Sequence, residues 1–512
     1  MKDENLYTRL SQGFPEAPDK AIFAQLEDGR HYTYAHVEQV SARMGAALQA
    51  MDVLPGDRVA VQLEKSIEAF MLYLATVRAG AIFLPLNTAY TPAEIQYFLT
   101  DAEPKLFVCA PERAEELRPV ATKAGARLET LGVWTAGADY ASAGTFLPLV
   151  TADASFRTVE RDKDDLAAIL YTSGTTGRSK GAMTTHGNLA SNAVTLCKYW
   201  SFTAKDVLLH ALPIFHVHGL FTSSNTILAA GASMIWQHRF NPDNAVAALP
   251  KATAMMGVPT FYTRLLDHPD FTGDLVRHMR LFISGSAPML VETHERFQEV
   301  TGHTVLERYG MTETQMNTSN PLEGRRVPGT VGPPLPDVDV KITDPETGRA
   351  LPMGEVGMIE VKGPNVFKGY WRMPDKTAEE LRADGFFITG DLGKIDDAGY
   401  VSIVGRSKDL IISGGYNIYP KEVEEAIDDL PGVMESAVIG CPHPDFGEGV
   451  VAVVVVEGGS SLTEEQVILG LADIARFKQP KRVFLVDALP RNTMGKVQKK
   501  ALREAHADVF QG

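Results

Sequence analysis

Residues 166–180 read LAAILYTSGTTGRSK, an apolar run followed directly by a loop of small hydroxyl-bearing and glycine residues. The run LAAIL is typical of a strand that is buried on both faces of a parallel sheet. The backbone N–H groups of such a loop can form a concave nest for phosphate oxygens, and Lys180 adds a mobile positive charge. No Ser or Thr follows Lys180, so the order differs from the GxxxxGK[ST] loop of P-loop proteins. The stretch therefore predicts a phosphate site at a strand end, although such a loop alone is more often a solvated connection.

Short apolar runs alternate with helical patterns on both sides of this loop. DRVAVQL (57–63) and AIFLPL (81–86) are predicted strands, and SIEAFMLYLATVRAG (66–80) between them is a predicted helix. This alternation predicts parallel sheets that are covered by helices on both faces. Near residue 355 the pattern changes to short runs separated by Gly and Asp, which predicts antiparallel pairs in a small β-barrel-like part.

The predicted fold class is α/β, with more than one domain. At 512 residues the chain is too long for one ordinary core. We expect a large N-terminal domain (1–405) of mixed, largely parallel α/β subdomains that includes the β-barrel-like part. The rest of the chain (406–512) alternates strands and helices over about one hundred residues, which is enough for a small α+β C-terminal domain.

Composition and charge exclude several classes of function. The formal charge is −15 and no stretch is basic enough to follow a nucleic-acid backbone, so no nucleic-acid partner is expected. No apolar run approaches 18 residues, so no membrane partner is expected either. The three cysteines are widely separated and match no metal-ligand spacing, which favours a reducing compartment. The N-terminus MKDENLYTRL is unlike a signal peptide, and we expect a cytoplasmic enzyme.

Four further motifs follow the opening loop in order. They are ERYGMTET (307–314), ITGDLG (388–393), GRSKDLIISGGYNIYP (405–420) and PRNTMGKVQK (490–499). Together with YTSGTTGRSKG, this set resembles the signature motifs of the adenylate-forming superfamily of acyl-CoA synthetases, luciferases and peptide-synthetase adenylation domains. The resemblance covers about residues 20–505. It implies that ATP, with Mg²⁺, and a carboxylate form an acyl-AMP while pyrophosphate leaves, and that a thiol then captures the acyl group.

The resemblance also implies roles for individual residues, and their chemistry is suitable. Glu313 offers a carboxylate to Mg²⁺, Asp391 can accept hydrogen bonds from ribose hydroxyls, and Lys496 can stabilise charge at the reacting phosphate. Taken alone, each would more often be a solvated loop or turn residue. The predicted catalytic residues are Lys496, Thr312, Glu313, Lys180 and His216. The predicted ATP-binding residues are Thr172, Ser173, Gly174, Thr175, Thr176, Gly177, Lys180, Tyr309, Thr312, Asp391 and Arg406.

Relatives in this superfamily rotate the small domain between the two half-reactions, which implies a mobile C-terminal domain here. Lys408 occupies the hinge position of the motif. Gly414, Gly415 and Tyr416 would then support coenzyme A. Relatives with this C-terminal motif are often acetylated on the lysine that corresponds to Lys496, so a lysine acetyltransferase and deacetylase are candidate partners.

The acid is chosen outside these motifs. PIFHVHGL (213–220) and GVPTFYTRLL (257–266) correspond to segments that line the acyl pocket in relatives, and a buried arginine there would pair with a second carboxylate. The whole pattern resembles that of bacterial malonyl-CoA synthetases, which implies malonate as the acid, with methylmalonate tolerated. Met311 would shorten the pocket. The candidate acid-binding residues are His216, Arg264, Arg280, Ser284 and Met311.

Three other interpretations stay open. The chain can be a synthetase for another short or aromatic acid, or an adenylation enzyme that loads a carrier protein. It can also be an inactive relative that acts as a binding protein, although Lys180, Glu313 and Lys496 argue against this. Either a monomer or a homo-oligomer is compatible with the sequence.

Overall fold

The computed structural model describes residues 3–132, 144–150, 156–172, 179–413, 416–472, 474–492 and 495–511. Five predicted phosphate-binding residues (173–177) and two predicted coenzyme A residues (414 and 415) lie outside these ranges. The chain forms two compact units, one of Met1–Asp339 with Val361–Phe387 and one of Val340–Glu360 with Ile388–Gly512. Each unit is described by itself below.

The first unit contains two large sheets. One has the strand order β17-β8-β7-β4-β3-β5-β6, and the other has the order β14-β13-β12-β11-β9-β10-β1-β2. The strands of the first sheet are β3 (Arg58–Gln62), β4 (Ile82–Pro85), β5 (Leu106–Cys109), β6 (Arg127–Thr130), β7 (Leu166–Thr172), β8 (Lys180–Thr185) and β17 (Gly369–Tyr370). Those of the second are β1 (Ile22–Leu26), β2 (His31–Thr33), β9 (Val207–His210), β10 (Ser233–Trp236), β11 (Ala254–Gly257), β12 (Leu281–Ser284), β13 (Leu306–Met311) and β14 (Gln315–Ser319).

Most strand pairs in these sheets are parallel, as predicted. The neighbours from β7 through β4, β3 and β5 to β6 are parallel, and so are those from β1 through β10, β9, β11 and β12 to β13. Antiparallel pairs lie at the sheet ends, where β2, β8, β14 and β17 are joined. The sequence reason is that runs such as AIFLPL are apolar at consecutive positions and are buried on both faces.

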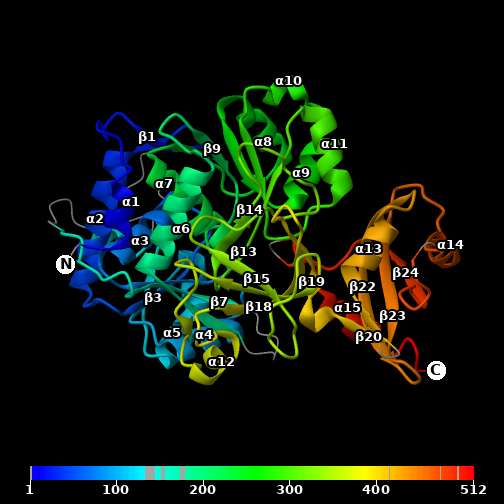
Figure 1. The fold of residues 1–512 in the computed structure, drawn as a ribbon. Coiled ribbons are helices and arrows are strands. Elements are labelled where there is room, and N and C mark those ends of the chain that lie inside the picture. Colours follow the sequence, from blue (N-terminus) through cyan, green and yellow to red (C-terminus); the bar gives the residue numbers. More distant parts are fainter. Residues whose placement is uncertain are drawn as a thin grey trace. The chain divides into compact units, whose positions relative to one another are not determined.

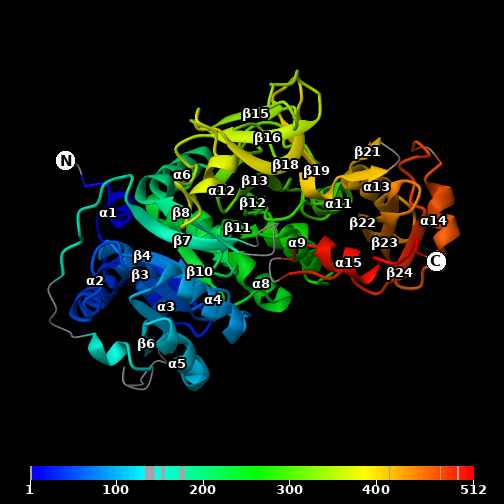
Figure 2. The same ribbon diagram turned by 90° about the horizontal axis from the view of Figure 1, so that it is seen from below.

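Helices cover both sheets. Helix α3 (Ile67–Arg78) is buried along its whole length, and its Tyr73 and Phe70 contact Phe83 of β4 and Trp236 of β10, so α3 lies between the sheets. The outer face of one sheet packs on α4 and α5, and α5 lies beside β6 in Figure 2. The outer face of the other packs on α8, α9 and α11, grouped beside β9 in Figure 1. The helices of this unit are α1 (Leu6–Ser11), α2 (Tyr34–Ala50), α3, α4 (Pro92–Ala102), α5 (Ala114–Lys123), α6 (His186–Tyr199), α7 (Thr226–Ala230), α8 (Pro242–Ala248), α9 (Pro259–Leu266), α10 (Gly273–Val276), α11 (Val291–Thr301) and α12 (Pro374–Glu380).

The second unit contains two smaller sheets. Strands β15-β16-β18-β19 form the sheet that was expected as the β-barrel-like part, and β21-β20-β23-β22 with β24 beside β23 form the other. Helices α13 and α14 pack on one face of the β22–β23 pair and α15 packs on the opposite face. The elements are β15 (Asp339–Thr343), β16 (Gly357–Lys362), β18 (Phe387–Ile395), β19 (Val401–Arg406), β20 (Ile411–Ser413), β21 (Tyr416–Ile418), α13 (Pro420–Asp428), β22 (Val433–His443), β23 (Gly447–Val456), α14 (Glu464–Gly470), β24 (Arg482–Val486) and α15 (Lys499–Ala505).

The predicted fold class is confirmed by this arrangement. The two compact units do not meet at a single boundary between residues 405 and 406. Strands β15 and β16 form one sheet with β18 and β19 and are therefore grouped with the C-terminal part of the chain. The two-domain division at that position stays a prediction. Within the described ranges, no helix combines the length and apolar character that crossing a membrane requires.

Candidate active site

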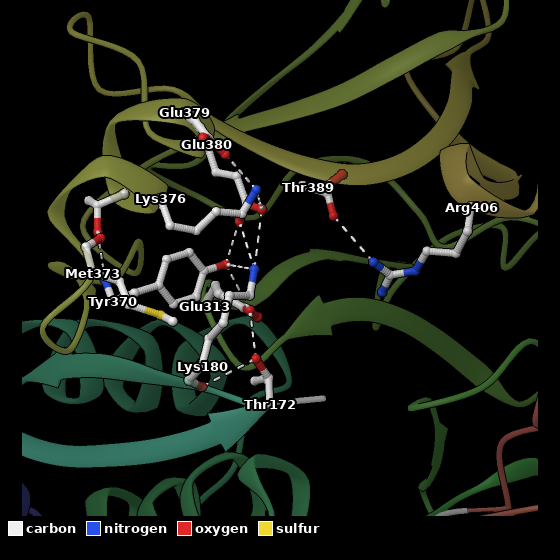
Figure 3. A network of polar contacts seen from close by, with 11 residues as sticks. Thr172, Lys180, Glu313, Tyr370, Met373, Lys376, Glu379, Glu380, Thr389 and Arg406 are labelled. Atoms are coloured by element: carbon white, nitrogen blue, oxygen red, sulfur yellow. Dashed lines mark hydrogen bonds and ion pairs between the residues drawn. The ribbon is translucent and has the colours of Figure 1, made fainter. Parts of the chain in front are cut away.

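Lys180, the first residue of β8, is buried within a polar network in the first unit (Figure 3). Its Nζ donates to Tyr370 Oη at 3.0 Å and to the two carboxylate oxygens of Glu380 at 3.1 and 3.2 Å. Tyr370 belongs to β17, which pairs with β8, and Glu380 ends the short helix α12 that follows. The predicted phosphate-binding lysine is therefore held in the seven-stranded sheet beside Thr172, the last residue of β7 and its register partner.

Glu313 joins the same network from the other sheet. It follows β13 and is buried, and its Oε1 accepts hydrogen bonds from Thr172 Oγ1 at 3.3 Å and from Tyr370 Oη at 3.1 Å. Its backbone oxygen accepts from the N–H of Phe367 at 2.8 Å. Three predicted site residues, Thr172, Lys180 and Glu313, are thus brought together although up to 141 positions separate them.

Arg308 is a buried cation at the carboxyl edge of the eight-stranded sheet. It lies on β13 with 3% of its surface exposed, and among the described residues no group accepts a hydrogen bond from its Nε or Nη2. Burial lowers the pKa of Arg308 to about 9. A guanidinium without a partner in such surroundings is costly, so an anion that reaches it would be bound strongly.

The neighbours of Arg308 are small or polar. A Cβ atom on Gly285, directly after β12, would lie 2.4 Å from Cζ of Arg308. Ser284, the last residue of β12, is buried, and its Oγ has no hydrogen-bond partner among the described residues. His218 is buried with Nδ1 3.1 Å from Oγ of Ser286, and burial followed by the charge of Arg308 lowers its pKa well below the usual value. His218 is therefore neutral, and the group is a buried polar cluster whose positive charge is that of Arg308.

The two arginines that were predicted to bind the acid lie elsewhere. Arg280 precedes β12 at the amino end of the strands, where Nε donates to Asp206 at 2.6 Å and Nη1 donates to the backbone oxygen of Trp200 at 2.9 Å. Arg264 lies in the last turn of α9 and is exposed. Ligands of parallel sheets bind at the carboxyl ends of strands, so the position of Arg280 does not fit the predicted role, and Arg308 fits it better.

The remaining first-unit candidates lie near the strand ends. His216 and Thr312 both line a small cavity of about 40 Å³, together with Pro85, Asn87, Tyr90, Leu170, Tyr171 and Phe215. Tyr309 is buried on β13, and Met311 packs against the cluster of Ala182, Phe367, Tyr370 and Phe387. This contact with Tyr370 places Met311 on the side of the Lys180 network.

In the second unit, Asp391 and Arg406 form an ion pair. They are register partners on β18 and β19, and Nε of Arg406 lies 2.7 Å from Oδ1 of Asp391. Nη1 of Arg406 also donates to the backbone oxygen of Thr389 at 3.3 Å, the contact drawn in Figure 3. Asp391 is buried, so its carboxylate is fixed, as a ribose-binding group requires.

Lys496 is electrostatically coupled to this pair. Loss of solvent around its ammonium group and then the charge of Arg406 lower the pKa of Lys496, against an opposing effect of Asp391. Gly495 has φ of +74°, which a residue with a side chain rarely adopts, and the N–H of Lys496 donates to Oδ1 of Asn492 at 3.0 Å. The predicted hinge residue Lys408 is exposed, and Tyr416 is exposed and stacks on Phe477 with ring centroids 4.6 Å apart.

This fold, with its site segments in this order, defines the class of adenylate-forming enzymes, which activate a carboxylate as its acyl-AMP. The chain belongs to that family: the description AMP-binding enzyme matches residues 12–371, and the description AMP-binding enzyme C-terminal domain matches residues 422–496. The superfamily that the five motifs predicted is thereby confirmed.

Individual relatives match nearly the whole chain. It is 57% identical to ATP-bound MatB from Rhodopseudomonas palustris, with 99% of this chain and 100% of that chain covered and a TM-score of 0.95. It is 34% identical over 526 residues to a malonate–CoA ligase of Arabidopsis thaliana, covering 93% of this chain and 85% of the relative. It is also 37% identical over 482 residues to a feruloyl-CoA synthase of an Amycolatopsis species, covering 93% and 94%. The predicted resemblance to malonyl-CoA synthetases is confirmed, and the feruloyl relative shows that family membership does not fix the acid.

Sequence reasoning did not identify three residues of the candidate site. Tyr370 and Glu380 lie outside the five motifs and meet Lys180 only through the pairing of β8 with β17. Arg308 lies inside the motif ERYGMTET, but no role was predicted for it. A signal was present, because an arginine in the middle of a strand whose neighbours are all buried requires an anionic partner.

Proposed function

We propose that this protein is an AMP-forming acid–thiol ligase that joins malonate, with methylmalonate tolerated, to coenzyme A. The observation that carries the choice of acid is Arg308, a buried guanidinium at the carboxyl edge of the strands whose Nε and Nη2 have no acceptor in the described part of the chain. A monocarboxylate has no group to neutralise this charge, whereas the second carboxylate of malonate can accept two parallel hydrogen bonds from it. The similarity to a malonate–CoA ligase and to MatB supports the same choice.

The residues around Arg308 suit a short dicarboxylate. The Ser284 hydroxyl is a second unpaired donor, and neutral His218 adds a polar ring without adding a charge. His216, at the nearby cavity, would line the other side of the acid. A longer or apolar acid would leave these buried polar groups without partners, which costs binding free energy.

In the first half-reaction an oxygen of one malonate carboxylate attacks the α-phosphorus of ATP. The bond from that phosphorus to the oxygen that bridges to the β-phosphate breaks, and pyrophosphate leaves with the electron pair. We assign Lys180 to the β- and γ-phosphates and Thr312 to the α-phosphate. Asp391 and Arg406 would hold the ribose, Tyr309 would contact the adenine, and Lys496 would supply positive charge as the attack occurs.

Glu313 fits the role of a magnesium ligand. Its carboxylate is buried beside Lys180 and is fixed by Thr172 and Tyr370, and Mg²⁺ usually takes one or two carboxylates together with substrate phosphates. When bound, the ion would neutralise part of the charge of the triphosphate. Glu313 would orient it, and Thr172 and Tyr370 would orient Glu313.

In the second half-reaction the sulfur of coenzyme A, after losing its proton, attacks the acyl carbon and AMP leaves. Tyr416 is an exposed aromatic residue that could support coenzyme A, and Lys408 is the proposed hinge. We also propose that acetylation of Lys496 switches off the first half-reaction, because it removes the charge that step needs. A cytoplasmic location is supported by the three free cysteines, Cys109, Cys197 and Cys441.

A substrate panel tests the proposal. Pyrophosphate release should be much faster with malonate than with acetate, octanoate or 4-coumarate. Arg308→Met should lower kcat/KM for malonate by about a hundredfold or more, which corresponds to loss of a charge-assisted hydrogen-bonded contact of about 3 kcal/mol. Arg264→Met and Arg280→Met are the matched controls, and neither should change the ranking of acids. Equal rates with malonate and octanoate would refute malonate as the substrate.

A further inference from the structure

The ammonium group of Lys180 has all of its donors committed. An ammonium has three N–H bonds, and among the described residues three acceptors lie near Nζ: Tyr370 Oη and the two carboxylate oxygens of Glu380, at 3.0 to 3.2 Å. The centroid of the Tyr370 ring also lies 4.1 Å from Nζ, so Tyr370 contacts the ammonium with both its ring and its hydroxyl group. A phosphate oxygen can therefore contact Lys180 only if one of these acceptors is exchanged.

Glu380 is the acceptor that can be exchanged. Tyr370 is anchored on β17, where its N–H donates to Thr377 Oγ1 at 2.9 Å and the Thr377 hydroxyl donates to the backbone oxygen of Met373 at 2.9 Å. Glu380 is the last residue of α12, so its long side chain is the part with conformational freedom. It also has a second cation nearby, because Lys376 Nζ lies 3.0 Å from its Oε1.

Glu380 is ionised in this arrangement. Burial opposes ionisation, but hydrogen bonds from Tyr370 and Lys376, and the charge of Lys180, lower the pKa of Glu380 overall. The hydroxyl of Tyr370 donates its single proton to both carboxylates, with the closer contact to Glu380 Oε2 at 2.6 Å and the longer one to Glu313 Oε1 at 3.1 Å. The Glu380 carboxylate thus supplies the negative charge that a phosphate group would supply to Lys180 in its absence.

We propose that Glu380 is a positioning residue that serves as an exchangeable internal anion for Lys180. It holds the buried ammonium in place until a phosphate group of the nucleotide replaces it, and it returns to Lys180 as pyrophosphate leaves. A buried ammonium without a partner is costly, so the contact keeps Lys180 ordered and at the same time reduces its net affinity for phosphates. This inference rests on the proposed function, in which Lys180 binds the β- and γ-phosphates.

Glu380→Gln tests the inference, because glutamine has nearly the same shape but no charge to compete with phosphate. Binding of inorganic pyrophosphate and of ATP should tighten, with Kd falling about threefold to tenfold, and KM for ATP should fall while kcat falls or stays level. Structural damage would weaken binding, so a gain in affinity separates the two explanations. The matched control is Glu379→Gln, since Glu379 is exposed and pairs only with Lys376 among the contacts of this network, at 2.7 Å. Its Kd values should equal those of the unaltered enzyme.

Three results would overturn the inference: weaker binding in Glu380→Gln, unchanged binding, or an equal change in Glu379→Gln. If Glu380→Gln does not fold, Glu380→Asp decides, because its shorter side chain loosens the contact with Lys180. It should tighten pyrophosphate binding by a smaller factor, and unchanged binding would again overturn the inference. Failure of the proposed function is distinguishable, because the unaltered enzyme would then neither bind ATP nor release pyrophosphate when malonate is added.

Discussion

Gly285 leaves the space that the guanidinium of Arg308 occupies. A Cβ atom at position 285 would lie 2.4 Å from Cζ and 2.5 Å from Nη1 of Arg308, distances at which one of the two groups must move. Arg308 is buried, so its side chain would have to leave its present position on β13 to reach solvent. The position of the proposed acid-binding cation therefore depends on the absence of a side chain at residue 285.

Gly285→Ala should reduce malonate use selectively. The added methyl group displaces the guanidinium, and a shift of about 1 Å at a substrate-positioning group can cost about a hundredfold in rate. We expect kcat/KM for malonate to fall by at least tenfold while KM for ATP stays level, since the Lys180 network lies elsewhere. Steady-state pyrophosphate release with both substrates varied would check this. Equal losses for malonate and for acetate would show that the methyl group damages the site in general and does not act through Arg308.

Arg308→Met should stabilise the protein while it removes malonate recognition. The unpaired buried cation lowers stability, and replacing buried charge by a well-packed apolar side chain often adds about 1–4 kcal/mol. Tm without substrate should rise. Malonate should raise Tm of the unaltered enzyme, because a ligand that binds only the folded state stabilises it, and should leave Tm of the variant unchanged. Arg264→Met, at an exposed position, serves as the control and should respond to malonate normally. A lower Tm for Arg308→Met would mean that Arg308 is a structural residue.

Asp428 should make the second unit less stable as the pH rises. Burial, with the nearby charges of Glu424 and Glu435, raises the pKa of Asp428 to about 8. The folded form therefore favours the protonated carboxyl group, and stability is highest below the ordinary aspartate pKa and is lost as the pH rises toward 8. Asp428→Asn should remove this loss, so the difference in Tm between variant and unaltered protein should grow from pH 5 to pH 9. The control variant is Asp445→Asn, at an exposed position of the same unit whose charge is not among those that raise the pKa of Asp428. A difference in Tm that does not change with pH would contradict the assignment.

The sequence predicted the reaction class better than the acid, and the reason is physical. Adenylation needs phosphate, ribose and metal contacts that short motifs carry in a fixed order, so residues such as Lys180 and Asp391 can be located from local pattern. The proposed acid site combines Arg308 with Gly285 and His218, which come from three segments that only the fold brings together. Arg280 looked equivalent in sequence, but it precedes β12 and meets Asp206, whereas Ser284 at the other end of the strand reaches the site. Whether an arginine can contact a ligand therefore depends on the end of the strand at which it lies, and the residue type alone does not show this.

Lys496 should limit the first half-reaction at alkaline pH and should be dispensable for the second. Desolvation and the charge of Arg406 lower its pKa, so its ammonium loses the proton at a lower pH than an ordinary lysine, whose pKa is about 10.4. Formation of acyl-AMP, measured as pyrophosphate release in a single turnover, should therefore decline at a pH below that value. Lys496→Arg should shift this decline to a higher pH, because a guanidinium keeps its charge, although its different shape will lower the rate itself.

Lys496→Ala should abolish acyl-AMP formation and retain most of the transfer from supplied malonyl-AMP to coenzyme A. Lys500→Ala, at an exposed position four residues away, should behave as the unaltered enzyme does. If Lys496→Ala loses both half-reactions equally, Lys496 acts through the fold of its segment and the separation of roles between the two steps is wrong.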